Sequence, residues 1–283
     1  MPHPAIASGN VAVITGGASG IGLAAAMRFA KAGMKVCIAD IGAERLKAAE
    51  TKLSSAAPGG SAGVMAVSVD VSDIAQVRDL ESTVQKRFGG TDILMNNAGI
   101  GPDSSSFGPL DNWQRILAVN LWGVINGTQT FAPYMIERGR PGLIINTGSK
   151  QGITTPPGNP AYNVSKAGVK ALTEALQHEL RNTQGCRISA HLMIPGHVFT
   201  GLTARGRTEK PASAWTPEET VDFMIERLEA GDFYILCPDN DVPRKLDERR
   251  ILWAAGDIVE NRPALSRWHP DYADAFAAWV KKG

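Results

Sequence analysis

The sequence contains few cysteines and lacks any long hydrophobic run. Cys37, Cys186 and Cys237 are the three cysteines among 283 residues, and each falls in an apolar, strand-like run. An odd number placed this way predicts buried free thiols in a reducing compartment rather than a disulfide framework. No apolar run approaches the ~18 residues that a membrane span requires. The first residues, "MPHPAIASGN", lack the charged and apolar regions of a signal peptide, so we expect a cytoplasmic protein without a membrane partner.

Neither sign of charge predominates in the sequence, and no histidines or cysteines have the spacing of metal ligands. The 29 Lys and Arg residues nearly balance the 28 Asp and Glu residues, and no basic block occurs, which argues against a nucleic-acid partner. The five histidines form no His-x₃-His pair and the cysteines form no Cys-x₂-Cys pair, so no metal site is expected. A hydrophobic fraction of 43% over this length is typical of one large globular domain.

Short apolar runs alternate with helical patterns along the chain. Strands are predicted at residues 11–15, 35–40, 63–70, 92–97, 142–148, 187–194 and 233–238. Helices are predicted at about 21–32, 44–54, 74–88, 112–138, 161–182 and 217–230. Near-continuous apolar strands joined by helices indicate a parallel sheet covered on both faces. With right-handed crossovers, the expected fold is α/β: a doubly wound, Rossmann-like sheet of seven strands in a single domain with a C-terminal helical extension.

The stretch "ITGGASGIG" (14–22) joins the first strand to the first helix and spaces Gly16, Gly20 and Gly22. Glycines permit a tight turn and close approach of the backbone to a pyrophosphate at the helix N-terminus. The spacing G-x-x-x-G-x-G differs from the common dinucleotide fingerprint, and a tight strand–helix packing turn is the alternative.

The second predicted strand supports the dinucleotide interpretation. It ends at Asp40, where a carboxylate can accept hydrogen bonds from an adenosine ribose, although a solvated acid at a strand end is the alternative. This acid would repel a 2′-phosphate, and no Arg or Lys occupies the glycine turn, so NAD is favoured over NADP.

The stretch "YNVSK" carries the candidate acid–base chemistry. Tyr162 and Lys166 are four residues apart, so they share one face of a helix. A phenol has a pKa of about 10, and a neighbouring ammonium together with an oxidised nicotinamide would lower it. An ordinary surface pair is the alternative. Ser149 closes a predicted strand, and parallel strands place their ligands at this carboxyl edge.

These motifs occur in one order along the chain: "TGGASGIG" (15–22), "CIAD" (37–40), "VDV" (69–71), "NNAG" (96–99), Asn120, "NTGS" (146–149), "YNVSK" (162–166) and "PGHVFT" (195–200). In this order they resemble the short-chain dehydrogenase/reductase family over about residues 8–240. The resemblance implies that Tyr162 is the acid/base and that Lys166 lowers its pKa and holds the nicotinamide ribose. It also implies that Ser149 orients the substrate oxygen and that Asn120 holds a water in a proton relay. One departure is Gly148, where the family often has another serine.

The resemblance also implies the cofactor contacts. They are Gly16, Ser19, Gly20, Ile21, Gly22, Asp40, Asp70, Val71, Asn97, Ala98, Gly99, Tyr162, Lys166, Pro195, Gly196, Val198 and Thr200. It implies a dehydrogenase domain over residues 8–240, including a substrate-binding segment at 197–230, and an extension at 241–283.

The expected activity is NAD-dependent hydride transfer to or from a hydrophobic or aromatic secondary alcohol or ketone. Expected substrate contacts are Ser149, Gln151, Ile153, Pro156, Tyr162, His197, Phe199, Leu202 and Trp215, a largely apolar set. His197 is equally compatible with an ordinary loop histidine. A non-catalytic dinucleotide-sensing protein is the alternative function, and a hydrolase is disfavoured because no G-x-S-x-G elbow occurs.

The C-terminal tail has a strongly aromatic helical face. The aromatic residues Trp268, Tyr272, Phe276 and Trp279 recur at three- and four-residue spacing. Pro270 suits the first turn of the predicted helix. Such a face must be buried, either on its own subunit or on a neighbouring subunit near the substrate pocket. The family resemblance implies a homodimer or homotetramer that pairs through the two long helices at 112–138 and 161–182.

Overall fold

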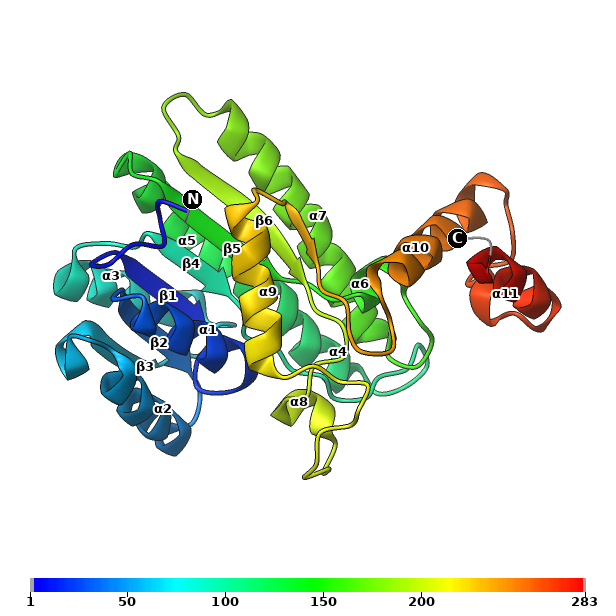
Figure 1. Ribbon diagram of the computed structural model, residues 1–283, viewed down its shortest axis with the longest axis horizontal. Helices are drawn as coiled ribbons and strands as arrows, with labels where there is room; N and C mark the ends of the chain where they lie inside the picture. Colours follow the sequence, from blue (N-terminus) through cyan, green and yellow to red (C-terminus); the bar gives the residue numbers. More distant parts are fainter. Residues whose placement is uncertain (1–2, 282–283) are drawn as a thin grey trace.

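The seven predicted strands form one parallel sheet. The computed structural model describes residues 3–281, and its strand order is β3-β2-β1-β4-β5-β6-β7 (Figure 1). The strands are β1 (Val11–Thr15), β2 (Lys35–Asp40), β3 (Val64–Ser68), β4 (Ile93–Asn96), β5 (Gly142–Thr147), β6 (Ile188–Ile194) and β7 (Tyr234–Leu236). Their ends differ from the predicted ends by at most two residues. The order steps outward from β1 in both directions, which makes the sheet doubly wound as predicted.

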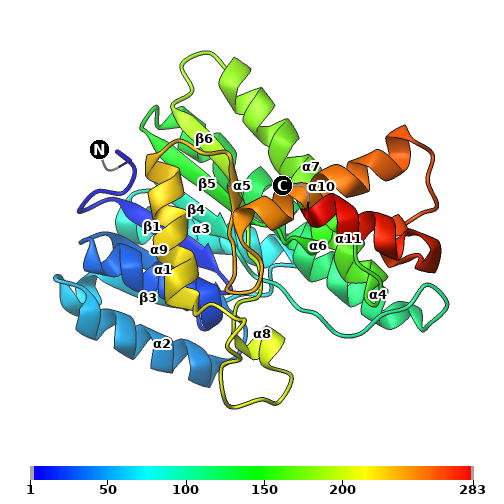
Figure 2. The ribbon, with the colours of Figure 1, turned by 45° about the vertical axis from the view of Figure 1, so that its right-hand side comes forward.

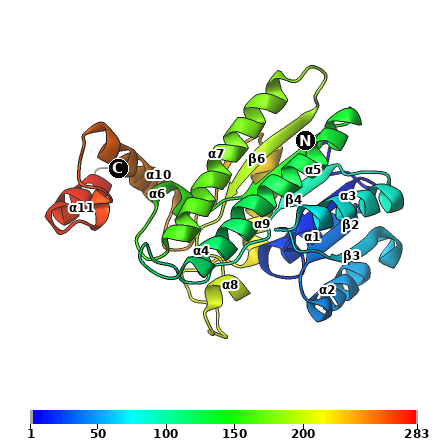
Figure 3. The same ribbon diagram turned by 180° about the vertical axis from the view of Figure 1, so that it is seen from behind.

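Helices cover both faces of this sheet. The α-helices of the described chain are α1 (Gly20–Lys31), α2 (Ala43–Ala56), α3 (Ile74–Phe88), α4 (Leu110–Leu117), α5 (Gly123–Glu137), α6 (Gln151–Thr154), α7 (Pro160–Asn182), α8 (Gly201–Ala204), α9 (Pro217–Glu229), α10 (Arg244–Val259) and α11 (Ala273–Lys281). Alternate residues of β1 face opposite sides: Ile14 packs with α1, α2 and α9, whereas Val13 packs with α3, α5 and α7. Figure 3 shows α5 and α7 side by side on the face opposite α1.

The helix predicted at 112–138 is interrupted, so that prediction is corrected. A π-helical turn, Ala118–Trp122, separates α4 from α5. Asn120 lies in this turn and is fully buried. Its side chain accepts a hydrogen bond from Ile100 N at 2.8 Å and donates to Ile100 O at 2.9 Å. These bonds attach the helix to the loop after β4, and π-helical turns of this kind occur frequently at functional sites.

The last part of the described chain, residues 244–281, is called here the C-terminal arm. Figures 1 and 3 show it extending away from the sheet, and Figure 2 shows α10 starting beside α6. Helix α10 was not predicted, because "RKLDERR" dominates its first half. Trp253 of α10 is buried against Phe276 and Trp279, with ring centroids 5.4 Å and 6.0 Å apart. Phe276 and Trp279 of the tail therefore pack on α10 of their own chain, whereas Trp268 of the same predicted face is 39% exposed.

The cysteines need one correction. Cys37 and Cys237 are buried, as expected, but Cys186 is half-exposed in the turn before β6. All three are free thiols. Within residues 3–281, no helix is long and apolar enough to cross a membrane, and no cluster of His, Cys, Asp and Glu is suited to a metal ion.

Candidate active site

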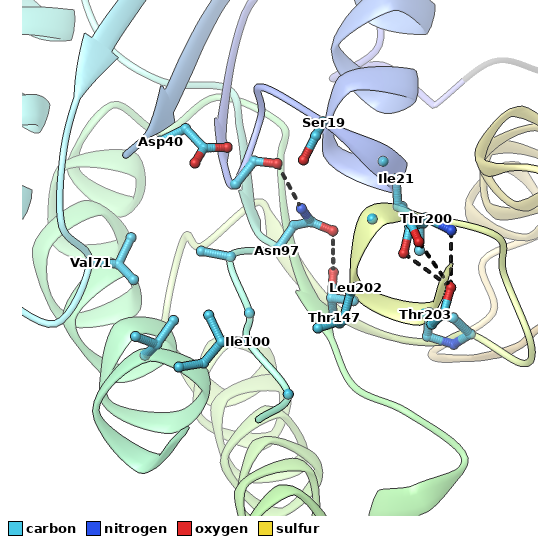
Figure 4. Close-up of a pocket in the computed structure, with 18 of the residues that line it drawn as sticks. Ser19, Ile21, Asp40, Val71, Asn97, Ile100, Thr147, Thr200, Leu202 and Thr203 are labelled. Atoms are coloured by element: carbon cyan, nitrogen blue, oxygen red, sulfur yellow. Dashed lines mark hydrogen bonds between the residues drawn. The ribbon is translucent and has the colours of Figure 1, made fainter. Parts of the chain in front are cut away.

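A cavity of about 510 Å³ lies at the carboxyl ends of β1, β2, β4, β5 and β6. Figure 4 shows side chains from these separate segments facing the same space, among them Asp40, Asn97 and Thr147. Gly16 and Asp40 line one end, and Ser149 and Tyr162 line the other. The parallel sheet itself brings these segments together, because the carboxyl ends of its strands share one edge.

The glycine turn has the shape that a pyrophosphate requires. Gly16 and Gly20 adopt φ values of +64° and +52°, which disfavour other residues. A Cβ atom at Gly22 would lie 2.2 Å from Gly16 O, so the helix can approach the turn only without a side chain. The Asn97 side-chain amide donates to Thr15 O at 3.2 Å and Gly16 O at 3.3 Å, which braces the turn (Figure 4).

The N-terminus of α1 leaves its donors available to an anion. Ser19, the N-cap residue, makes no side-chain capping bond, and within the described chain no acid occupies the first turn of α1. The first backbone N–H groups of a helix have no intrahelical acceptor, and the helix dipole favours negative charge there. Together with the turn, this end of the cavity fits a dinucleotide diphosphate.

The end of the cavity at β2, where an adenosine ribose is expected, is called here the adenosine end. It contains a fixed acid and an arginine that was not predicted from the sequence. Asp40 accepts hydrogen bonds from Ala18 N at 3.0 Å and from Ile41 N at 2.8 Å, which fix its carboxylate at the cavity wall. Arg45 also lines the cavity, and its guanidinium donates to Ile41 O at 3.1 Å. Arg45 lies five residues beyond Asp40, in the first turn of α2, and only the fold of that turn brings it back.

Most of the predicted cofactor contacts are gathered around this cavity. All of them line it except Gly22, which shapes the turn from behind. The lining residues that were not predicted as contacts, apart from Arg45, are Ala39, Ile41, Val69, Ile100, Gly101, Pro102, Val119, Thr147, Gly148, Gly201 and Thr203. Many of these residues adjoin predicted contacts in the sequence, so their position next to the strand ends could have identified them.

The reactive end contains Ser149, Tyr162 and Lys166. Lys166 is buried, its Nζ donates to Thr147 O at 2.8 Å, and the same nitrogen lies 5.8 Å from the Tyr162 ring centroid. Burial lowers the pKa of Lys166 to about 8. Burial also raises the pKa of Tyr162, an effect that the Ser149 hydroxyl partly opposes. Within residues 3–281 the pKa of Tyr162 is therefore shifted upward, whereas the expected depression also depends on the positive charge of an oxidised nicotinamide.

Asn120 does not line the cavity, although its neighbour Val119 does. The Asn120 side chain is occupied by Ile100 and by Ser165 Oγ, at 3.4 Å. The contact of Asn120 with a relay water therefore stays a prediction.

The predicted substrate residues divide into two groups. Ser149, Tyr162 and Leu202 line the cavity, whereas Gln151, Ile153, Pro156, His197, Phe199 and Trp215 do not. His197 Nδ1 lies 3.1 Å from Ser213 Oγ, and Trp215 donates from Nε1 to Asn240 Oδ1 at 3.0 Å. The backbones of His197 and Phe199 also bond the backbone of Trp215, so these residues help to fix the fold of the segment after β6.

The chain matches the family described as short chain dehydrogenase over residues 10–211. The chain belongs to this family. A 1-deoxy-11-beta-hydroxypentalenate dehydrogenase of Streptomyces exfoliatus is 32% identical over 266 residues, covering 92% of this chain and 94% of the relative. A 3beta-hydroxysteroid dehydrogenase of Eggerthella lenta is 38% identical over 202 residues, covering 71% and 75% respectively. A short-chain dehydrogenase/reductase of Burkholderia phymatum, solved in complex with NAD, superposes with a TM-score of 0.81. Its identity is 31%, covering 90% of this chain and 96% of that one.

Proposed function

We propose that the protein is an NAD-dependent oxidoreductase that transfers a hydride between the cofactor and the carbinol or carbonyl carbon of a hydrophobic secondary alcohol or ketone. The observation that carries this proposal is one cavity with a phosphate-binding turn and Asp40 at one end, and Ser149 and Tyr162 at the other. A bound nicotinamide ring supplies the hydride acceptor or donor. The named relatives, a hydroxypentalenate and a hydroxysteroid dehydrogenase, support an apolar substrate class.

Tyr162 is the group proposed to exchange a proton with the substrate oxygen. Its pKa is raised by burial, so the phenol is protonated near neutral pH and can donate to a carbonyl in the reduction direction. In the oxidation direction the phenolate is needed, and positive charge close to the phenol favours it. Ser149 is proposed to orient the substrate oxygen, and buried Lys166, held by Thr147, to supply positive charge beside the phenol and contact the nicotinamide ribose. Asn120 is proposed to help hold a water in the proton relay.

NAD is proposed as the preferred cofactor because of Asp40. Its carboxylate is held at the cavity wall by two backbone N–H groups, where it can accept from a ribose diol and repel a 2′-phosphate. Arg45 acts in the opposite sense, because its guanidinium lines the same end of the cavity. Because the Arg45 guanidinium donates to Ile41 O, part of its hydrogen-bonding capacity is used within the protein rather than on a cofactor.

A cytoplasmic homodimer or homotetramer is proposed as the working assembly. Trp122, Tyr134 and Val164, on the paired helices of one face, are 56%, 51% and 48% exposed. A second copy that packed there would remove them from water. The domain boundaries at 8–240 and 241–283 remain predictions, and residues 282–283 lie outside the described part of the chain.

The test is the absorbance of NADH at 340 nm, measured with NAD and a panel of apolar secondary alcohols. Tyr162→Phe should lower turnover by ~10²–10⁴-fold while NAD still binds, because the variant lacks only the exchangeable proton. Tyr234→Phe is the matched control, since it removes a hydroxyl on β7 that donates to Glu174 and does not line the cavity. Turnover of Tyr162→Phe near that of the control would remove Tyr162 from the chemistry. NAD binding without turnover of any alcohol or ketone would favour the dinucleotide-sensing alternative.

A further inference from the structure

A buried ion cluster lies next to the reactive end of the cavity. Lys150 directly follows Ser149, and its Nζ lies 3.3 Å from Asp239 Oδ2 and 2.6 Å from Asp247 Oδ2. Asp239 and Asp247 are 8% and 4% exposed. The three residues come from three segments: the turn after β5, the loop after β7 and the first turn of α10.

Two members of the cluster hold the cavity wall directly. Asp239 Oδ2 also accepts a hydrogen bond from His197 N at 3.1 Å, and Lys150 N donates to Pro195 O at 3.4 Å. A Cβ atom at Gly196 would lie 2.5 Å from Asp239 Oδ2 and 2.9 Å from Lys150 Nζ. Pro195 and Gly196 line the cavity beside Ser149, at the end of the neighbouring strand, so Lys150 and Asp239 help to set the spacing between these two strand ends.

The third member connects this wall to the C-terminal arm. Asp247 lies in the first turn of α10, and the same helix carries Trp253, which packs against Phe276 and Trp279. Burial raises the pKa of Asp247, and the Lys150 ammonium opposes that shift. Removing one partner from a buried ion pair leaves an uncompensated charge, so the cluster resists any displacement of α10 from the turn that bears Ser149.

Resting on the proposed function, we propose that Lys150, Asp239 and Asp247 are positioning residues for the reaction. They hold Ser149 against the turn formed by Pro195 and Gly196, and they make the geometry of the reactive end depend on the C-terminal arm. The adenosine end, around Asp40, shares no residue with the cluster. Loss of the cluster should therefore impair turnover without impairing occupation of the adenosine end.

The experiment compares Lys150→Met and Asp247→Asn with the wild-type protein. Turnover is measured with the best alcohol of the panel, and ADP-ribose binding is measured by calorimetry, because ADP-ribose lacks the nicotinamide. We expect kcat to fall on the order of 10²-fold, the effect typical of a misplacement near 1 Å, with the Kd for ADP-ribose changed by less than about twofold. Asp247→Asn keeps the side-chain shape, so it remains informative if Lys150→Met folds poorly.

Arg138→Met is the matched control. Arg138 pairs with buried Asp92 at 3.3 Å, at the opposite, amino edge of the sheet. This variant should lose stability but keep kcat. An equal loss of kcat in Arg138→Met, parallel losses of kcat and ADP-ribose binding in the cluster variants, or unchanged kcat in Asp247→Asn would each overturn the positioning role. A wild-type protein that binds ADP-ribose but turns over no substrate would instead overturn the proposed function, and this inference with it.

Discussion

Lys166→Met should make the stability of the protein respond differently to pH. Burial lowers the Lys166 pKa from 10.5 to about 8, so between these values the unfolded chain binds more protons at this site than the folded chain. Stability contributed by this group therefore rises with pH from about 8 to 10.5. Methionine has a similar length and does not titrate, so the variant lacks this slope.

The magnitude follows from the size of the shift. A change of about 2.5 units corresponds to roughly 3.4 kcal/mol that the charged lysine costs the folded state at low pH. Between pH 7 and pH 10, about 2.5 kcal/mol of that cost is relieved in the wild-type protein. The variant also loses the bond to Thr147 O, which leaves a buried carbonyl unpaired at a cost of about 1–3 kcal/mol. At pH 7 the relieved charge cost is the larger effect, so the variant should be more stable than wild type by roughly 0.4–2.4 kcal/mol. At pH 10 most of that cost is already relieved in the wild-type protein, so the variant should be the less stable of the two.

The assay is urea denaturation of the cofactor-free proteins at pH 7, 8, 9 and 10. The difference in unfolding free energy between variant and wild type cancels the other groups that titrate in this range. Lys170→Met is the control, because it removes a lysine one turn further along α7 whose side chain is 37% exposed and paired with Glu174. Its difference from wild type should change much less with pH.

A difference between Lys166→Met and wild type that stays flat within about 0.5 kcal/mol from pH 7 to pH 10 would refute the reasoning. In that case burial would not penalise the Lys166 charge, and the account of its lowered pKa would be wrong. If the difference between Lys170→Met and wild type also changed steeply with pH, the effect would follow from losing a lysine of α7 rather than from burial of Lys166.

Three further changes test the cofactor end and the arm. Asp40→Ala should weaken NAD binding and narrow the gap to NADP in kcat/KM; a wild-type protein that uses NADP at least as well as NAD would contradict this. Gly22→Ala places a Cβ atom 2.2 Å from Gly16 O and should weaken NAD binding by the equivalent of about 1–3 kcal/mol in a titration, whereas Gly63→Ala, which meets open space, should not. Deleting residues 263–283 should weaken the assembly, so that light scattering reports fewer subunits per particle, and should change KM for substrate more than KM for NAD. An unaltered number of subunits and an unaltered substrate KM would limit this segment to packing on α10.

Local patterns predicted the sheet, and the family resemblance implied most of the residues that line the cavity. Apolar runs with helical stretches between them identify seven parallel strands, and the carboxyl ends of parallel strands meet at one edge whatever the loops do. Residues at those ends, such as Asp40, Asn97 and Ser149, therefore lie together in the structure. Tyr162 and Lys166 share a helix face because they are four residues apart.

Features that depend on distant segments were missed or misplaced. At the π-helical turn, the Asn120 side chain bonds a loop twenty residues away. His197 and Trp215 were expected at the substrate, yet they bond Ser213 and Asn240 instead. Arg45 reaches the cavity only through the turn before α2.

The sequence by itself determined which elements form, how they are ordered and which chemical groups reach the edge of the sheet, because propensity and periodicity act between near neighbours. Only the tertiary structure decided how those groups are charged and what they touch. Lys166 is buried against Thr147, and Lys150 meets two carboxylates from segments about ninety residues further along the chain. Burial and Coulomb interactions depend on which distant segments pack together, so these properties appear only when the fold is complete.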